Sequence, residues 1–345
     1  FFSKHTTATE MLRSLVGSEM CIRDSQYASG INPITKKEGW WNYAVGPGKS
    51  FDTDKFFVIC ANVIGGCMGS YGPGTIDPLT NKPIGTNFPV ITINDMVNAQ
   101  YNLLDYLKIE KLFAVAGGSM GGMQVLQFVS NFPNKARVAL PIACTASHSA
   151  QNIAFNELGR QAIMSDSNWK DGLSGEKSIN PDKGLAVARM AAHITYLSKQ
   201  GLQEKFGRNL QERSDLKFGF DADFQIESYL RYQGSVFVDR FDANSYLYIT
   251  RAMDYFDLTK QYGGNLSKAF KDTKTKFFII SFTSDWLYPT SENKDIVIAL
   301  NAIGADVGFV EIKTDKGHDS FLLDVPDFLS TIKNYLNTTY SNINE

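Results

Sequence analysis

The chain has 345 residues, of which 43% are hydrophobic and 20% are charged, enough to bury a large globular core. A formal net charge of −2 without a long basic block argues against a nucleic-acid or anionic-membrane partner. No apolar stretch reaches the roughly 18 residues of a membrane-spanning helix, and we recognise no secretory signal.

Residues 1–25 differ from the rest of the chain. They show no clear periodicity, and the piece SLVGSEMCIRDS resembles translated sequencing-adaptor read-through. We therefore treat 1–25 as a non-native segment outside functional reasoning and expect the native sequence to resume near Gln26.

From Gln26 onward, short apolar runs alternate with amphipathic stretches, separated by a Gly- and Pro-rich loop at 65–90. The apolar runs predict strands at 56–64, 112–118, 138–144, 276–282 and 307–312. The amphipathic stretches predict a helix capped by Thr92 or Asn94, helices at 121–131 and 292–303, and a last helix that carries Phe328, Ile332 and Leu336. This alternation implies an α/β fold with a mostly parallel sheet flanked by helices.

The pattern changes between about residues 148 and 256, which read as mostly helical, polar and aromatic. Stretches such as GLAVARMAAHITYLS and SYLYITRAMDYF show this composition. We predict an α/β core formed by 26–147 and 257–345, interrupted by an inserted helical cap at 148–256.

Cysteine usage indicates a reducing compartment. The four cysteines, at positions 21, 60, 67 and 144, form no C-x-x-C pair, and a chain of this size needs no disulfide staples. We expect buried thiols, a cytoplasmic location and no bound metal.

One hydroxyl lies among four glycines in FAVAGGSMGGMQ, residues 113–124. Gly117-Gly118-Ser119-Met120-Gly121 fits G-x-S-x-G between a predicted strand and a predicted helix, the arrangement that presents a nucleophilic serine. The Met120 N–H, at the start of that helix, would help to bind an oxyanion. A phosphate-binding P-loop would need a following Lys, and the spacing breaks the dinucleotide-binding pattern.

A nucleophilic serine needs a histidine base, and on this fold the triad follows the chain order Ser, Asp or Glu, His. The chain has four histidines, at 5, 148, 193 and 318. His5 lies in the excluded segment, His148 has no acid between it and Ser119 in the required order, and His193 lies in an apparent helix. His318 follows the strand predicted at 307–312 and is the expected base.

The orienting acid is expected at the end of another strand. Asp285 comes directly after the strand predicted at 276–282, where open α/β sheets build their sites. Asp315 and Asp319 compete, but they are so close to His318 in sequence that they are less able to reach around its ring. We predict the catalytic triad Ser119–Asp285–His318.

The triad and its surroundings resemble the homoserine O-acetyltransferase family of α/β-hydrolase-fold acyltransferases. The matching stretches cover nearly all of residues 27–336 and include GWWNYAVGPGKSFDTDKFFVICANVIGGCMGSYGP, NFPVITINDMVNAQ, GGSMGGMQ, SAQNIAFNELGRQAI, GLAVARMAAHITYLS, RFDANSYLYITRAMDYFDL, SFTSDWLYP and DKGHDSFLL. The resemblance implies acyl transfer from an acyl-CoA, most simply acetyl-CoA as co-substrate, to the hydroxyl of L-homoserine in methionine biosynthesis. It also implies an acyl-Ser119 intermediate, no bound cofactor, and a homodimer built through the cap.

The resemblance assigns three substrate-binding residues. Arg189 and Tyr196 match the positions that bind the homoserine carboxylate and line the site, and Asp319 matches the acid that binds the amino group. These residue types suit the roles, because Arg offers a bidentate fork to a carboxylate and Asp an anion to an ammonium.

The chain departs from the family at its N-terminal side. Family members carry a strand ending in a His-Ala-Leu-Thr-Gly-Asp-like turn, which supplies the second oxyanion-hole N–H, whereas here the adaptor-like segment takes its place. We therefore expect the first strands and half of the oxyanion hole to be missing. Two alternatives stay open: an esterase or thioesterase on the same fold, or an inactive truncated product.

Overall fold

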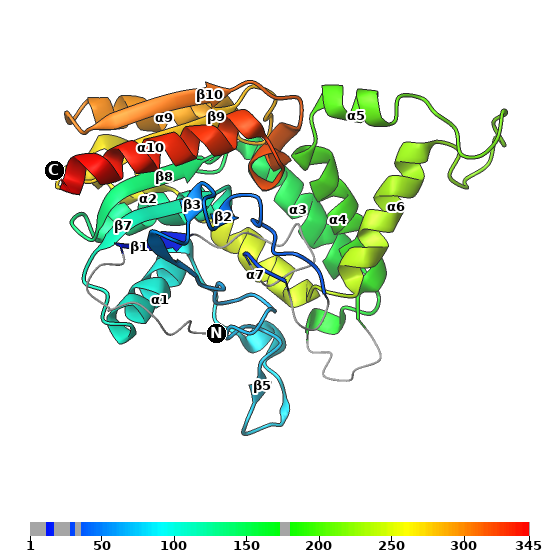
Figure 1. Ribbon diagram of the computed structural model, residues 1–345. Helices are drawn as coiled ribbons and strands as arrows, with labels where there is room; N and C mark the ends of the chain where they lie inside the picture. The colour runs from blue at the N-terminus through cyan, green and yellow to red at the C-terminus, as the bar shows by residue number, and fades with distance from the viewer. Residues whose placement is uncertain (1–11, 17–27, 32–35, 173–179, 345) are drawn as a thin grey trace.

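A six-stranded parallel sheet forms the centre of the computed structural model, which describes residues 12–16, 28–31, 36–172 and 180–344. The strand order is β10-β9-β8-β7-β1-β4, and every neighbouring pair is parallel. The strands are β1 (Leu12–Val16), β4 (Phe56–Cys60), β7 (Leu112–Gly118), β8 (Ala136–Ile142), β9 (Lys276–Phe282) and β10 (Val307–Ile312). The predicted fold class is confirmed, and Figure 1 shows the sheet flanked by helices.

Most predicted strands match the observed ones. β7, β9 and β10 have the predicted residues, β8 begins and ends two residues early, and β4 ends at Cys60 rather than at residue 64. The predicted loop at 65–90 contains a small antiparallel pair, β5 (Ile76–Asp77) with β6 (Lys82–Pro83). A second small pair, β2 (Val45–Gly46) with β3 (Phe51–Asp52), is parallel.

Strand β1 lies in the segment treated as non-native, so part of that segment takes part in the sheet, contrary to the expectation that the first strands are missing. Its backbone pairs with β4 on one side, from Leu12 opposite Phe56, and with β7 on the other, from Ser14 opposite Ala114. It therefore occupies a position inside the sheet, next to the strand that leads to Ser119. The turn expected to be missing would follow this strand, at 17–27, which lies outside the described residues.

Helices cover both faces of the sheet, and each face has its own apolar layer. Residues from α1, α2 and α9 join one layer with Leu112, Val115 and Phe277. α10 crosses the other face (Figure 1), where Phe328, Ile332 and Leu336 are fully buried, as predicted for the last helix. The helices are α1 (Ile93–Tyr106), α2 (Met120–Asn131), α8 (Leu258–Gln261), α9 (Thr290–Asn301) and α10 (Pro326–Asn344).

Helix boundaries follow from local signals. Thr92 caps α1, because its side chain accepts from the Asp95 N–H while the Asp95 carboxylate accepts from the Thr92 N–H, which confirms one of the two predicted caps. The described residues also include the short 3₁₀ helices η1 (Gly85–Asn87), η2 (Lys170–Gly172), η3 (Leu266–Phe270) and η4 (Gly317–Leu322).

Five α-helices lie in the described part of residues 148–256, the range predicted as a helical cap. They are α3 (Ala150–Met164), α4 (Asp182–Tyr196), α5 (Lys199–Lys205), α6 (Gln225–Val238) and α7 (Ala243–Asp254), and Figure 1 shows α3, α4 and α6 side by side. Glycines allow this close packing: a Cβ on Gly184 would lie 2.3 Å from the Ala162 carbonyl oxygen, and one on Gly234 would lie 2.8 Å from that of Ala186. The domain boundaries themselves stay a prediction.

In the part of the chain that the structure describes, no helix is long and apolar enough to cross a membrane.

Candidate active site

Ser119 lies at the sharp turn between β7 and α2. Its backbone has φ 55° and ψ −124°, in the left-handed region that non-glycine residues rarely occupy, so the turn is strained. The Ser119 N–H donates to the Ile142 carbonyl oxygen at 3.0 Å, which ties the strained residue to the end of β8. This backbone is that of a nucleophile elbow.

The glycines around Ser119 allow backbone and side chains to approach closely. A Cβ on Gly117 would lie 2.5 Å from the Gly121 backbone, and one on Gly118 would lie 2.6 Å from the Phe321 ring. A Cβ on Gly122 would lie 2.7 Å from the Cys144 Sγ. Each distance is far inside van der Waals contact, so packing at this turn requires glycine at all three positions.

Asp285 and His318 form a buried hydrogen-bonded pair. The His318 Nδ1 lies 2.7 Å from the Asp285 Oδ2, and both side chains are at most 1% exposed. The other carboxylate oxygen accepts from the N–H groups of Leu287 and Tyr288, at 3.0 and 2.9 Å, which fixes the Asp285 side chain in place. This carboxylate can orient the imidazole with Nε2 available as a base.

Two tyrosine rings lie beside the predicted base. The buried His318 Nε2 has no hydrogen-bond partner among the described residues, and Tyr288 lines the same cavity as Ser119. The ring of His318 lies 5.1 Å from that of Tyr288 and 6.2 Å from that of Tyr196, between centroids. Tyrosines from the Asp285 loop and from the cap therefore border the predicted base.

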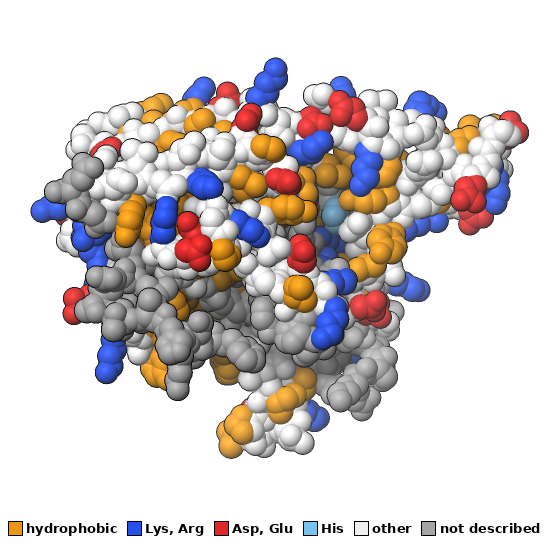
Figure 2. All heavy atoms as spheres, viewed as in Figure 1, with side chains coloured by type: hydrophobic (Ala, Val, Ile, Leu, Met, Phe, Trp, Pro, Cys, Tyr) orange, Lys and Arg blue, Asp and Glu red, His pale blue; other side chains and the backbone are white. Residues whose placement is uncertain are grey.

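Ser119 opens into a cavity covered by the cap. The cavity is lined by Ser119, His148, Asn152, Phe155, Asn156, Ala192, Thr195, Tyr196, Tyr246, Met253, Leu287 and Tyr288. Most of these residues come from α3, α4 and α7, so these helices form most of the cavity wall. A second, open cavity of about 550 Å³ lies beside α5 and is lined mainly by apolar residues, among them Leu197, Phe206 and Trp286; apolar side chains gather there on the surface in Figure 2.

The structure brings the three predicted substrate-binding residues together beside His318. The Arg189 guanidinium lies 5.6 Å from the centroid of the Tyr196 ring and 4.6 Å from that of Phe237. Asp319 directly follows His318 on η4. Burial raises the pKa of Tyr229, the nearby Asp319 charge raises it further, and Arg189 opposes the shift. A cationic and an anionic side chain thus lie near one tyrosine.

His193, on α4, is a buried neutral histidine. Its pKa is lowered to about 3, chiefly by burial and then by the positive charges of Arg189 and Arg240. The ring packs against Tyr196 and Tyr229, with centroids 5.8 Å apart in both cases. His193 lies in helix α4, as expected from the sequence. Its lowered pKa makes it unsuited to take up a proton near neutral pH.

Met120 is the first residue of α2, so its N–H has no acceptor within the helix. This position suits the predicted oxyanion donor.

No group of three or more His, Cys, Asp or Glu side chains in the described ranges is placed to hold a metal ion. The expectation of buried thiols is correct for Cys144 and wrong for Cys60, which is exposed.

A second histidine–carboxylate pair, not predicted from the sequence, has its histidine in the lining of the Ser119 cavity. No acid stands between Ser119 and His148 in chain order, yet the His148 Nδ1 lies 3.0 Å from the Asp254 Oδ1. Its Nε2 lies 2.8 Å from the Tyr288 hydroxyl. His148 follows β8 as His318 follows β10, so its position at the carboxyl end of a strand is the sequence signal that could have marked it as a site residue. No comparable sequence signal marks Asp254, which lies at the end of α7.

Comparison with known proteins agrees with this geometry. The model of the alpha/beta hydrolase fold family matches residues 34–325. The homoserine O-acetyltransferase of Pelagibacter ubique (strain HTCC1062) is 80% identical over 320 residues, which are 93% of this chain and 86% of that protein.

Two solved structures share the architecture. Esterase E22 superposes with a TM-score of 0.85 at 27% identity, over 96% of this chain and 91% of that chain. A homoserine O-acetyltransferase from Bacillus anthracis superposes with a TM-score of 0.86 at 24% identity, over 96% and 90% of the two chains, a likeness of fold. On its sequence identity and its fold, this chain belongs to the homoserine O-acetyltransferase family of α/β hydrolases.

Proposed function

We propose that this chain transfers the acetyl group of acetyl-CoA to the hydroxyl of L-homoserine through an acetyl-Ser119 intermediate. The observation that carries the proposal is the buried Asp285–His318 pair, 2.7 Å apart, together with the strained backbone of Ser119 in a chain of this family. Each group has a role that its position allows.

In the first half-reaction, the Ser119 Oγ attacks the thioester carbonyl carbon while His318 Nε2 takes the hydroxyl proton. The Met120 N–H donates to the oxygen that becomes negative, and the helix dipole of α2 adds to this stabilisation. The C–S bond then breaks, and the His318 proton goes to the CoA sulfur. The products are CoA and acetyl-Ser119.

In the second half-reaction, the homoserine hydroxyl attacks the acetyl carbon while His318 takes its proton. The bond to Ser119 Oγ breaks, and His318 returns the proton to Ser119. Arg189 would bind the homoserine carboxylate and Asp319 its ammonium group, which directs the hydroxyl toward Ser119. The product is O-acetylhomoserine.

The runner-up function is ester hydrolysis, which the 27% identity and the close superposition to esterase E22 favour. The two functions differ in whether water or homoserine discharges the acyl-enzyme. The test measures CoA release from acetyl-CoA with and without homoserine. We expect release to depend on homoserine; release at the full rate without homoserine would contradict the transferase proposal and support hydrolysis.

The same assay with succinyl-CoA and with L-serine tests the acyl donor and the acceptor. A homodimer formed through the cap remains a prediction from the family resemblance, and light scattering tests it. A cytoplasmic location remains a prediction from cysteine usage. The inactive-product alternative predicts no CoA release under any of these conditions.

A further inference from the structure

The Asp285 carboxylate is held by two backbone peptide units. Its Oδ1 accepts from the N–H groups of Leu287 and Tyr288, at 3.0 and 2.9 Å, while its Oδ2 lies 2.7 Å from the His318 Nδ1. The first N–H belongs to the peptide unit that joins Trp286 to Leu287, and the second belongs to the unit that joins Leu287 to Tyr288. The orientation of these two peptide planes therefore determines how the carboxylate faces the imidazole.

Cap helix α3 contacts the carbonyl end of both peptide units. The Asn152 Nδ2 donates to the Leu287 carbonyl oxygen at 2.9 Å, and the Gln151 Nε2 donates to the Trp286 carbonyl oxygen at 3.2 Å. A peptide unit is planar, and in the trans form its C=O and N–H point in opposite directions. A hydrogen bond that fixes the carbonyl therefore also fixes the N–H that meets Asp285.

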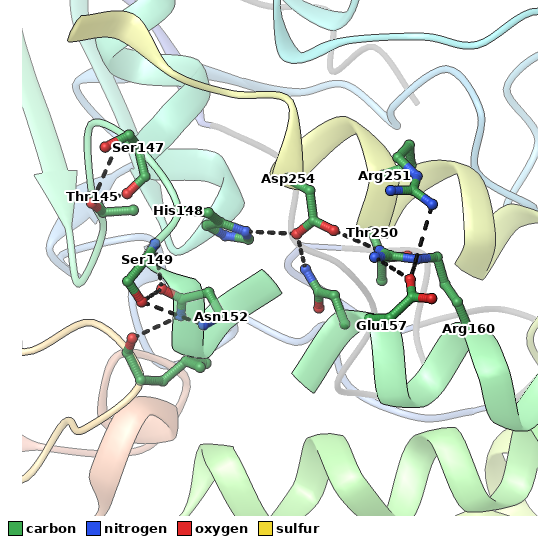
Figure 3. A network of polar contacts seen from close by, with 12 residues as sticks. Thr145, Ser147, His148, Ser149, Asn152, Glu157, Arg160, Thr250, Arg251 and Asp254 are labelled. Atoms are coloured by element: carbon green, nitrogen blue, oxygen red, sulfur yellow. Dashed lines mark hydrogen bonds and ion pairs between the residues drawn. The ribbon is translucent and has the colours of Figure 1, made fainter. Parts of the chain in front are cut away.

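Backbone partners determine how the Asn152 amide is turned. Its Oδ1 accepts from the Ser149 N–H at 3.1 Å, and a backbone N–H can only donate; Figure 3 shows Asn152 facing Ser149. Its Nδ2 faces the Leu287 carbonyl oxygen, which can only accept. The Asn152 side chain is 2% exposed, so bulk water does not compete for either bond. The direction of donation thus holds whatever the charge on any neighbouring side chain.

We propose that Asn152, on the cap, is a positioning residue that holds the Asp285 carboxylate toward His318. The inference rests on the proposed function, in which this pair activates the serine. The Asn152 amide fixes the Leu287 carbonyl, the same peptide unit directs its N–H at the carboxylate Oδ1, and Oδ2 is left facing the imidazole. Gln151 does the same for the preceding peptide unit, more weakly because its side chain is exposed and its bond is longer.

Loss of the Asn152 donor should slow acylation of the serine. Without this donor the peptide plane that joins Leu287 to Tyr288 can rotate, so the carboxylate orients the imidazole less well. We expect Asn152→Ala to lower the acylation rate about three- to tenfold, the factor for a typical neutral hydrogen bond. Asn152→Asp should lower it about 10- to 100-fold, because a carboxylate oxygen of the same shape then repels the Leu287 carbonyl oxygen.

The experiment uses p-nitrophenyl acetate and the full chain, without CoA or homoserine. Ser119 Oγ forms a bond to the acetyl carbon, p-nitrophenolate leaves, and the serine proton goes to His318; the burst of p-nitrophenolate gives the acylation rate constant. Ser149→Ala is the matched control, because it removes the hydroxyl that caps α3 at the Asn152 N–H and leaves the bond to Leu287 in place. This control should unfold at a lower urea concentration and acylate at the rate of the unmodified chain.

A double-mutant cycle tests whether Asn152 acts through Asp285. Asn152 also lines the Ser119 cavity, so a lost contact with substrate is the alternative cause of a lower rate. In Asp285→Ala no carboxylate is left to position, so adding Asn152→Ala should not change the residual rate. A substrate contact, or a general loss of structure, would lower the rate by the same factor in both backgrounds.

Gln151→Ala tests the second peptide unit and decides the matter if no Asn152 variant folds. Gln151 is not among the residues that line the Ser119 cavity, and its side chain is exposed. We expect Gln151→Ala to acylate about two- to threefold more slowly. This effect should also disappear in the Asp285→Ala background.

Two outcomes overturn the proposal: folded Asn152 variants that acylate at the rate of the unmodified chain, or an equal fall in both backgrounds. If no Asn152 variant folds, an unchanged rate for Gln151→Ala, or a fall that persists without the carboxylate, overturns it. Asp285→Ala alone separates this failure from that of the proposed function. A rate that Asp285→Ala leaves unchanged removes the triad, whereas a slow Asp285→Ala beside unaffected Asn152 variants removes only the positioning role.

Discussion

Gly317 lies directly against the backbone of Tyr196: a Cβ on this glycine would be 2.6 Å from the Tyr196 carbonyl oxygen and 2.5 Å from the Ser198 nitrogen. Its φ is +72°, and its N–H donates to the Ser284 Oγ at 2.9 Å. The residue before His318 is thus fixed between the end of cap helix α4 and the loop of Asp285. The position of the base depends on this contact.

Substitution of this glycine should displace His318. We expect Gly317→Ala to lower kcat about 100-fold, because a shift of about 1 Å in a catalytic group can cost that much. Gly304→Ala is the control: Gly304 has φ +68°, but a Cβ there meets nothing within 4 Å. It should cost about 1 kcal/mol of unfolding free energy through backbone strain and leave kcat unchanged. Equal kcat for the two variants, measured alongside urea unfolding, would refute the role of this contact.

Asp285 should be the acid that orients His318. Asp285→Asn replaces the acceptor of the Nδ1 hydrogen with an amide that can favour the wrong tautomer, and we expect kcat to fall by about 10⁴. Asp315→Asn changes the competing acid three residues before His318, whose carboxylate bonds the exposed Lys316, and should retain near-normal kcat. A larger loss in Asp315→Asn than in Asp285→Asn would reassign the triad.

Arg189 should act in only one half-reaction. Arg189→Lys retains the charge but loses the bidentate fork, so kcat/KM for homoserine should fall about 10- to 100-fold. The rate of enzyme acylation by acetyl-CoA, measured before homoserine is added, should stay within about twofold. The control is Arg208→Lys. The Arg208 guanidinium also stacks on an aromatic ring, 5.1 Å from the centroid of Phe224, so this variant measures the effect of losing such stacking elsewhere. An equal loss in both half-reactions would contradict a homoserine-specific role.

His193 should make the folded state sensitive to acid. Its pKa is lowered to about 3 by burial and by neighbouring arginines, whereas in the unfolded chain it is about 6.5. Between these values only the unfolded state binds the proton, so stability falls as pH falls from about 6.5 towards 3. We expect His193→Gln to remove up to about 1.4 kcal/mol of this loss per pH unit. Urea unfolding from pH 4 to 8 measures it, and parallel curves for the two proteins across pH 4–6.5 would refute the assignment.

Elements with strong local signals were predictable from the sequence. The structure has β7, β9 and β10 at the residues that their apolar runs predict. It also has Thr92 as the N-cap of α1, one of the two residues predicted for that position. The predicted pair Asp285 and His318 also meets, because parallel strands bring their carboxyl ends to one edge of the sheet.

Relationships between distant segments were not predictable in the same way. His148 contacts Asp254 across 106 positions and Tyr288 across 140, and no spacing rule joins a strand end, a cap helix and a loop. The sheet position of β1 was missed for a different reason: pairing with β4 and β7 is decided by the partner strands, and the composition of 1–25 gave no strand signal.

The central claim is that Ser119 carries the acetyl group between CoA and homoserine. The most direct measurement is mass spectrometry of the intact chain and of its peptides after mixing with acetyl-CoA alone and then with L-homoserine. We predict one added acetyl group, located on Ser119, which disappears on addition of homoserine as O-acetylhomoserine forms. Formation of O-acetylhomoserine by Ser119→Ala, or an acetyl group on another residue that homoserine discharges, would contradict the account.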